Sequence, residues 1–170
     1  MKSCIPDRQD VEFVLRLLMP ENRLVMRLCL ATGLRIDDAL SVKSADLLKD
    51  RISIFEKKTG KKRVIRLPKG LKIDILKGSG VVYAFPHRDD GFRHRCRQTV
   101  WKDVKRAAKA LRIPDNITPH STRKLYANEL YAACGDVEKV SKALNHSSSD
   151  VTYLYYLAKN VPKISKKRQK

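Results

Sequence analysis

The chain has 170 residues and a formal net charge of +19 at pH 7, because 37 Lys and Arg residues face only 18 Asp and Glu residues. This length supports one domain with a core, and the charge favours a polyanionic partner, with nucleic acid, an anionic membrane surface and simple solubility as competing explanations. No apolar run reaches the roughly 20 residues of a membrane span, and residues 1–10 lack the apolar segment of a signal peptide, so a soluble, intracellular protein is expected.

Two helices and a short third are predicted in the first quarter of the chain. Apolar residues recur with helical spacing from Asp7 to Leu18, after Pro6 and Asp7 as start signals. A second helix begins near Pro20 and ends at Gly33, because glycine readily takes the left-handed conformation that ends helices. A short third helix is predicted over residues 36–41.

The pattern changes to β-strand after residue 50. Two short β-branched runs, RISIFE and VIRLP, flank the cationic segment KKTGKKR, which predicts a hairpin with its turn at Thr59 and Gly60. Further on, the run GVVYAFP over residues 80–86 is compatible with another strand or with an extended connection.

The rest of the chain is predicted to be helical. An amphipathic helix with a basic outer side is expected over residues 99–111, followed by helices over 120–134 and 137–144. Residues 159–170 are too polar and basic to join a core. The predicted fold class is therefore α+β, mainly helical with a small antiparallel β-sheet, with one domain over residues 1–158 and a basic tail over 159–170.

The cysteines and histidines give no metal or disulfide signal. The four cysteines are scattered without CxxC spacing, which predicts reduced thiols: Cys4, Cys29, Cys96 and Cys134. His87, His94 and Cys96 lie close together in the sequence, but no fourth ligand follows at a recognisable interval. Neither a metal site nor a cofactor site is expected.

Three side chains are candidates for binding an anion. His120 and Arg123 are three residues apart at a predicted helix start, so both project from one face and can share an anion. Arg35 follows the glycine that ends the second helix, where its side chain can reach over a site. An ordinary surface contact and an ordinary salt bridge are the competing interpretations.

The segment LNHSSSDVTYLYYL contains a second histidine and three tyrosines. In one continuous helix His146 and Tyr155 would face opposite sides, since nine residues at about 100° each amount to two and a half turns. Residues 147–150 are Ser and Asp, which cap helices and form turns, so a new helix starting near Asp150 can bring Tyr155 back toward His146. Simple packing of all three tyrosines is the alternative.

Taken together, these features resemble a known family. An arginine after ATGL, a lysine in a hairpin turn, an H-x-x-R motif, a histidine in LNHSS and a tyrosine nine residues later are the ordered signature of the tyrosine recombinases, or phage integrases. The resemblance to their catalytic domain extends from about residue 7 to residue 158. It implies six site residues: Arg35, Lys58, His120, Arg123, His146 and Tyr155.

The resemblance also implies a function. It is cleavage and rejoining of double-stranded DNA through a 3′-phosphotyrosine, without metal, ATP or another cofactor, in the integration or excision of a mobile element. The implied setting is a homo-oligomer on DNA, in the cytoplasm at the nucleoid. A noncatalytic DNA-binding regulator of the same fold is the alternative, and it predicts a degraded set of site residues where this set is complete. A hairpin-forming telomere resolvase would use the same chemistry.

Some positions depart from the family pattern. Thr122 and Lys124 flank the second arginine, where the family commonly has Leu and His, and Asn145 precedes the second histidine in place of Gly. The acidic residue three positions after the first arginine is Asp38. Tyr156 directly follows the expected nucleophile, and motif spacing favours Tyr155 over it. None of the departures removes a reacting group, but they bear on helix packing and rate.

Overall fold

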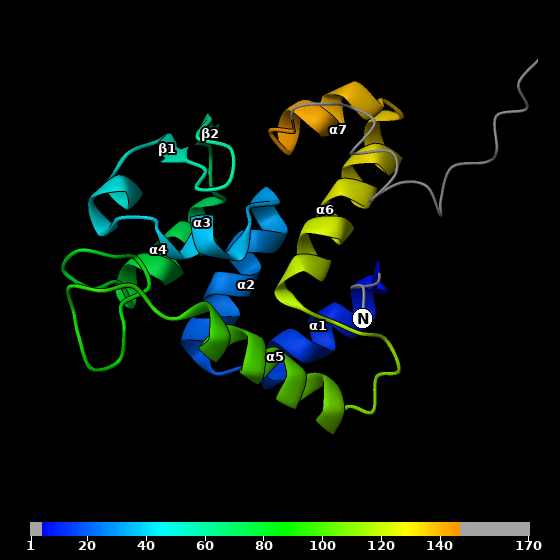
Figure 1. The fold of residues 1–170 in the computed structure, drawn as a ribbon, viewed down its shortest axis with the longest axis horizontal. Helices are drawn as coiled ribbons and strands as arrows, with labels where there is room; N and C mark the ends of the chain where they lie inside the picture. The colour runs from blue at the N-terminus through cyan, green and yellow to red at the C-terminus, as the bar shows by residue number, and fades with distance from the viewer. Residues whose placement is uncertain (1–4, 147–170) are drawn as a thin grey trace, which may run out of the picture. The chain divides into compact units, whose positions relative to one another are not determined.

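The structure of the protein is a computed structural model that describes residues 5–146 (Figure 1). The chain divides into two compact units, an amino-terminal unit of residues 1–126 and a carboxyl-terminal unit of residues 127–170. The predicted helix after residue 150, the tyrosines of that segment, the basic tail and the boundary at residue 158 lie outside the described residues.

Three helices open the amino-terminal unit, as the sequence predicts. They are α1 (Arg8–Leu17), α2 (Pro20–Thr32) and α3 (Ile36–Leu40). Asp7 caps α1 by accepting a hydrogen bond from the backbone N–H of Gln9. Gly33 ends α2 with a φ of 65°, in the left-handed region that suits glycine. This residue turns the chain directly into the segment that carries the first arginine.

The hairpin is also confirmed. After the 3-10 helix η1 (Ser44–Leu48), strand β1 (Ile52–Phe55) pairs antiparallel with β2 (Lys62–Ile65), and Ile54 lies opposite Arg63. Gly60 in the connecting turn has a φ of 65°, which a residue with a side chain rarely adopts. The hairpin therefore presents the lysines of its turn at one end of a short two-stranded sheet.

The segment after the hairpin differs in part from the secondary structure predicted from the sequence. Helix α4 (Lys69–Lys77) forms where no helix was predicted. Residues 80–86 form an irregular connection rather than a strand, with isolated bridges from Tyr83 to Lys43 and from Pro86 to His94. The predicted amphipathic helix follows as α5 (Arg97–Ala110), which packs against α1 (Figure 1).

The core of the amino-terminal unit gathers apolar side chains from α1 to α5 and from the hairpin. A buried polar link crosses it. The Asp103 carboxylate of α5 accepts hydrogen bonds from the backbone N–H of Met19 at 2.9 Å and from Asn22 Nδ2 at 2.8 Å. Arg106 donates to the same carboxylate at 2.6 Å and to the carbonyl oxygen of Leu17 at 2.7 Å. These contacts fix α5 to the junction between α1 and α2.

Helix α6 (Pro119–Cys134) begins in the amino-terminal unit, and α7 (Val137–Ala143) lies in the carboxyl-terminal unit. Helix α7 ends in a Schellman motif, because the N–H of Asn145 donates to the carbonyl of Lys142 and that of His146 to the carbonyl of Ser141, each at 3.0 Å. Asn145 has a φ of 55°, so it takes the left-handed position that the family usually gives to glycine.

The predicted fold class is thus confirmed: the described part is mainly helical with a two-stranded antiparallel sheet. Among residues 5–146, no helix has the length and apolar character needed to cross a membrane.

Candidate active site at the start of helix α6

Arg123 is the most deeply buried of the predicted site residues that lie within residues 5–146. It lies in the second turn of α6, its exposed fraction is 0%, and its Nη1 atom donates a 2.5 Å hydrogen bond to the carbonyl oxygen of Gly33. Gly33 is the residue that ends α2, and a helix end supplies a carbonyl without an intrahelical partner. The second arginine is therefore tied to the backbone two residues before the first arginine.

Arg35 also reaches this region. It is the N-cap residue of α3 and has an extended backbone, so its side chain leaves the helix start. Its side chain is 21% exposed, and Nη1 lies 2.6 Å from Oε2 of Glu56. A guanidinium has five N–H donors, so an ion pair on one nitrogen leaves others for an anion.

Both arginines line one small cavity together with the predicted histidine. This clamp cavity has a volume of about 180 Å³, and its lining residues are Leu34, Arg35, Ile36, Asp37, Pro119, His120 and Arg123. The space corresponds to about six water molecules at their liquid volume. The structure thus brings together three of the six predicted site residues around a cavity that suits a small anionic group.

His120 is uncharged at neutral pH in this setting. Its pKa is lowered from 6.5 to about 4, first by loss of solvent around the ring, although His120 as a whole residue is exposed. Nearby positive charges lower the pKa further: Arg123, Lys124, Arg35 and Lys58. A neutral imidazole has one ring nitrogen that can accept a proton or a hydrogen bond.

Lys58 lies in the hairpin turn and is exposed. Its charge is one of those that lower the pKa of His120, so its ammonium group acts electrostatically on the clamp cavity. The turn that carries it is closed by two backbone hydrogen bonds, from Thr59 and Gly60 to the carbonyl oxygen of Glu56, at 3.2 and 2.8 Å. Lys58 is therefore an exposed cation on a short, hydrogen-bonded turn.

Two charged residues beside the arginines, Glu56 and Arg63, were not predicted from the sequence. The Glu56 side chain is 0% exposed, and its Oε1 atom lies 3.6 Å from Nη1 of Arg63, whose side chain is 9% exposed. Arg63 also donates to the carbonyl oxygen of Thr32. A signal was present: strand residues alternate between faces, so Glu56 continues the buried phase of Ile52 and Ile54.

Asp38, the acidic residue three positions after Arg35, is buried beside this cluster. Its Oδ1 atom accepts a 3.0 Å hydrogen bond from the backbone N–H of Lys57. Burial raises its pKa and the negative charge of Glu56 adds to this, while the hydrogen bond from Lys57 and the charges of Arg35 and Arg123 oppose it. The shorter carboxylate thus contacts the hairpin backbone next to Lys58.

The departure at Thr122 is accommodated. Thr122 is fully buried, and its hydroxyl group donates a 2.8 Å hydrogen bond to the carbonyl oxygen of Pro119. The polar side chain in place of the usual Leu is therefore satisfied within the first turn of α6. The Lys124 departure places one more positive charge near His120.

Cys29 lies under the site and is inert. Burial raises the pKa of its thiol to about 12, against the opposing charge of Arg123. Cys29, Cys96 and Cys134 are free thiols. Within residues 5–146, no group of three or more His, Cys, Asp or Glu side chains is arranged to hold a metal ion, and this includes the His87, His94 and Cys96 segment.

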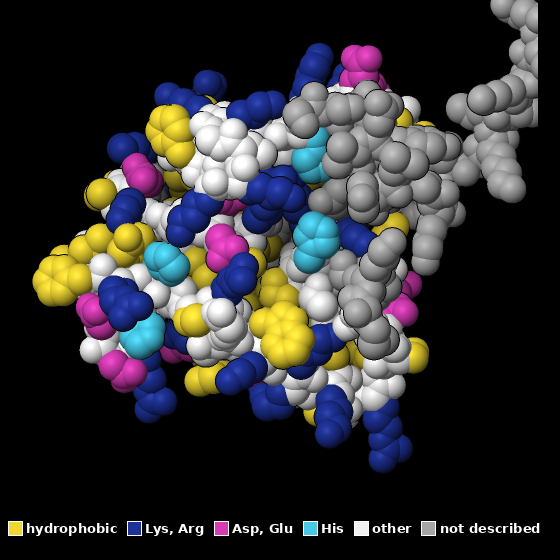
Figure 2. All heavy atoms as spheres, in the orientation of Figure 1, with side chains coloured by type: hydrophobic (Ala, Val, Ile, Leu, Met, Phe, Trp, Pro, Cys, Tyr) yellow, Lys and Arg dark blue, Asp and Glu magenta, His cyan; other side chains and the backbone are white. Residues whose placement is uncertain are grey.

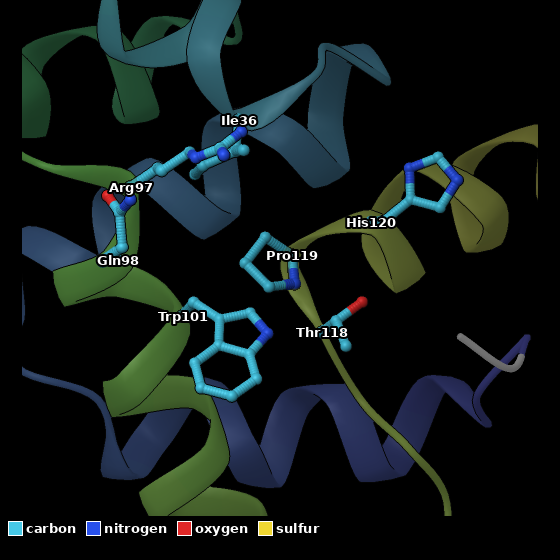
Figure 3. Close-up of a pocket in the computed structure, with 7 residues that line it drawn as sticks. All are labelled: Ile36, Arg97, Gln98, Trp101, Thr118, Pro119 and His120. Atoms are coloured by element: carbon cyan, nitrogen blue, oxygen red, sulfur yellow. The ribbon is translucent and has the colours of Figure 1, made fainter. Parts of the chain in front are cut away.

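A second cavity adjoins the clamp cavity and shares Ile36, Pro119 and His120 with it. It has a volume of about 480 Å³. Figure 3 shows the Trp101 ring of α5 opposite Pro119 and Thr118, with Arg97 and Gln98 at the start of α5. Lys and Arg side chains are spread over the surface visible in Figure 2 rather than gathered in one stripe. The visible face is therefore basic without a single cationic stripe.

The remaining two predicted site residues are His146 and Tyr155. His146 lies in the carboxyl-terminal unit, at the end of the Schellman motif. Tyr155 lies outside the described residues. That all six residues join in one site is therefore still a prediction.

Comparison with solved structures identifies the fold as that of tyrosine recombinase catalytic domains. The catalytic domain of bacteriophage HP1 integrase is 20% identical with a TM-score of 0.65, over 91% of this chain and 87% of that one. A lambda integrase fragment, crystallised as a dimer bound to a COC′ core site, is 20% identical with a TM-score of 0.76, over 100% of this chain and 63% of that one.

The sequence assigns the family. Residues 16–161 match the model of the phage integrase family, so the chain belongs to that family. The tyrosine recombinase XerC of Mesorhizobium japonicum is 28% identical over 143 residues, which cover 79% of this chain and 46% of the relative. The chain thus spans about half the length of the curated relatives it matches, with shares of 46% and 58% for two of them.

Proposed function

We propose that the protein cleaves and rejoins DNA strands at a specific site through a 3′-phosphotyrosine intermediate. The observation that carries the proposal is the clamp cavity, in which Arg35, Arg123 and an uncharged His120 line one small space. Membership of the phage integrase family supports it. A cavity with two guanidinium groups and a proton acceptor suits a phosphodiester under attack by a hydroxyl group.

The two arginines would bind the scissile phosphate. A phosphodiester repels nucleophiles because it is an anion, and its pentacoordinate transition state gathers more charge on the non-bridging oxygens. Guanidinium groups match these oxygens with paired hydrogen bonds and keep their charge at every accessible pH. Arg35 and Arg123 thus supply electrostatic stabilisation that grows as the reaction proceeds.

Tyr155 would be the nucleophile and His120 its base. A tyrosine hydroxyl group has a pKa near 10 and is a weak nucleophile at neutral pH until a base takes its proton. Since the pKa of His120 is lowered to about 4, its ring is unprotonated and ready to accept. The negative charge of a bound phosphate raises the pKa of His120 and makes it a better base.

The leaving group would be the 5′ oxygen of the broken strand. Tyr155 forms a bond to phosphorus as this P–O bond breaks, and Lys58 gives the departing oxygen its proton. His146 would donate a hydrogen bond to a phosphate oxygen. The 3′-phosphotyrosine keeps the energy of the broken bond, so a 5′ hydroxyl group can attack it and reverse the step without ATP.

Double-stranded DNA would be the partner, held mainly by backbone phosphates. The second cavity leads from His120 to Arg97 at the start of α5, and the formal net charge of +19 favours strongly salt-dependent binding. The proposed setting is an oligomer on DNA, since a crystallised relative is a dimer bound to a core site. A DNA partner also accounts for the expected cytoplasmic location at the nucleoid.

The proposed biological role is integration or excision of a mobile element, which the family description supports. Because the chain spans about half of its curated relatives, the activity of the whole protein is part of this proposal. No described contact favours the regulator or the telomere resolvase over the recombinase.

Covalent trapping tests the proposal. The chain is incubated with a pool of nicked duplexes that have randomised arms and cannot be religated, and adducts are separated by denaturing electrophoresis and sequenced. A 3′-linked adduct is expected with the native chain and with a chelator present, and none with Tyr155→Phe. An adduct that survives Tyr155→Phe but disappears in Tyr156→Phe would reassign the nucleophile, and no adduct with any duplex would refute the activity.

Lys58 has its own test on the recovered sequence. Lys58→Ala should slow cleavage, and a substrate with a 5′ sulfur leaving group, which needs no proton, should restore most of the rate. Cleavage of the sulfur substrate that stays as slow as that of the oxygen substrate would argue against Lys58 as the acid.

A further inference from the structure

Glu56 contacts both the first arginine and the turn that carries the lysine. Its Oε2 atom accepts from Nη1 of Arg35 at 2.6 Å and from the Thr59 hydroxyl group at 3.2 Å. Its backbone N–H donates to the carbonyl oxygen of Lys61 at 3.0 Å. Together with the bonds from Thr59 and Gly60 to its carbonyl oxygen, Glu56 holds both ends of the turn around Lys58.

A fully buried carboxylate is costly, so its surroundings must compensate for its charge. Arg35 and Arg63 do so from opposite oxygens, Oε2 and Oε1, at 2.6 and 3.6 Å. Removing the carboxylate alone would leave the buried Arg63 without its counter-charge, so Glu56 contributes to the stability of the fold. Its contacts with Arg35 and with the Lys58 turn give it a further role.

The charges around Glu56 point to orientation instead of affinity. Arg35, Arg63 and Arg123 are positive, and the Glu56 carboxylate opposes their charge. Glu56 thus weakens the attraction of the cluster for a phosphate. What it provides in return is a fixed direction for Arg35, whose side chain is otherwise long and partly exposed.

We infer that Glu56 is a positioning residue, which holds Arg35 and the Lys58 turn in a single arrangement so that the phosphate clamp and the leaving-group acid act on the same phosphodiester. The inference rests on the proposed function for its catalytic part. Its structural part, that Glu56 orients Arg35, stands on the contacts alone.

The variant Glu56→Gln keeps the size of the side chain and removes its charge. The matched control is Asp50→Asn, because Asp50 forms an exposed ion pair with Arg66 near the same hairpin, outside the cluster. The first measurement is the rate at which the Arg35 guanidinium group rotates, observed by ¹⁵N nuclear magnetic resonance. We expect slow rotation in the native chain and in Asp50→Asn, and fast rotation in Glu56→Gln.

The second measurement is single-turnover cleavage of the trapped duplex. Glu56→Gln removes one negative charge from the cluster, so binding should be as tight as in the native chain or tighter. The cleavage rate at saturation should fall by about tenfold to a hundredfold, because a small misplacement of a catalytic group has effects of this size. A merely structural defect would lower the active fraction without tightening binding.

The possible outcomes test separately whether Glu56 orients Arg35 and whether this orientation matters for cleavage. Equal guanidinium rotation in Glu56→Gln and the native chain overturns the positioning role, whether or not the chain cleaves DNA. Fast rotation in Glu56→Gln with a native rate of cleavage overturns its catalytic part. If Arg35 is released in Glu56→Gln but the native chain forms no adduct, the proposed reaction fails and the orienting contact is supported. Slow cleavage with unweakened binding supports the whole inference.

Discussion

Nη1 of Arg123 lies 2.5 Å from the carbonyl oxygen of Gly33, so the end of α2 holds the second arginine of the clamp. Arg123 is fully buried, and the carbonyl oxygen that it contacts belongs to a residue in the left-handed conformation. The orientation of this guanidinium group is therefore set by the packing of the amino-terminal unit before any ligand is present.

Arg123→Lys should abolish most of the cleavage although it keeps the positive charge. Lysine offers one ammonium group, which cannot contact Gly33 and a phosphate with the planar geometry of arginine. We expect adduct formation to slow by about a hundredfold or more, in line with the loss of one preorganised donor. The measurement is the rate of adduct formation, and Arg66→Lys, at an exposed ion pair, is the control that should keep the native rate.

His120 should titrate far below an ordinary histidine. Its pKa is lowered to about 4, so a ¹H–¹⁵N titration of the ring should show the neutral form from pH 8 down to about pH 5. Lys124→Gln removes one of the charges that lower the pKa and should move the midpoint upward, while Lys102→Gln on α5 should leave it in place. A midpoint near 6.5 in the native chain would contradict the electrostatic description of the cavity.

The same shift makes stability depend on pH. Below the ordinary pKa of 6.5 the unfolded chain binds a proton at His120 and the folded chain does not, so the free energy of unfolding should fall as pH drops from 6.5 toward 4. His120→Gln lacks this proton uptake and should lose that part of the pH dependence. Urea unfolding at a series of pH values measures the difference between the two chains.

Asp103→Asn should destabilise the amino-terminal unit by about 1–3 kcal/mol, since it leaves buried donors without a charged acceptor. Burial opposes ionisation of Asp103, but hydrogen bonds from Asn22, Arg106 and Met19 outweigh it and lower the pKa. Its stabilising effect is therefore complete above the unfolded pKa of about 3.9 and is lost as pH falls through the lower folded value. Urea unfolding checks both points, with Asp46→Asn at an exposed pair as the control.

The left-handed backbone of Asn145 should affect the hydrogen bond that the His146 amide makes. Its φ of 55° costs an alanine about 1 kcal/mol, so Asn145→Ala should destabilise the end of α7, and Asn145→Gly should be neutral or stabilising. Hydrogen exchange of the His146 amide, which donates to Ser141, reports this locally. Faster exchange in Asn145→Gly than in Asn145→Ala would contradict the Schellman assignment.

The sequence predicted most helices and the hairpin because their signals are local. Apolar spacing and a capping residue define α1, Gly33 ends α2, and Thr59 with Gly60 marks the turn. Helix α4 was missed because its apolar stripe is weak, with only Ile75 fully buried. Residues 80–86 were ambiguous because a short apolar run looks the same whether or not it pairs fully with another strand.

The sequence singled out some residues of the candidate site and missed others. Motif order singled out Arg35, His120 and Arg123, which do line one cavity. Glu56 and Arg63 were missed because a charged residue in a cationic hairpin is normally a solvent contact. The pairing of Ile54 with Arg63 across the strands and the contact of Glu56 with Arg35 show that these two charges point inward, in line with the alternation of strand residues.

The burial of Arg123 separates two tasks that positive charge performs in a DNA-binding protein. One buried cation adds little to the summed field that attracts a duplex from a distance, so long-range attraction must come from the many exposed lysines and arginines of the surface. Salt should then slow the search for DNA far more than it slows the bond-breaking step. Evolution can change how fast the chain finds DNA, by altering surface lysines, without touching the groups that would break the strand.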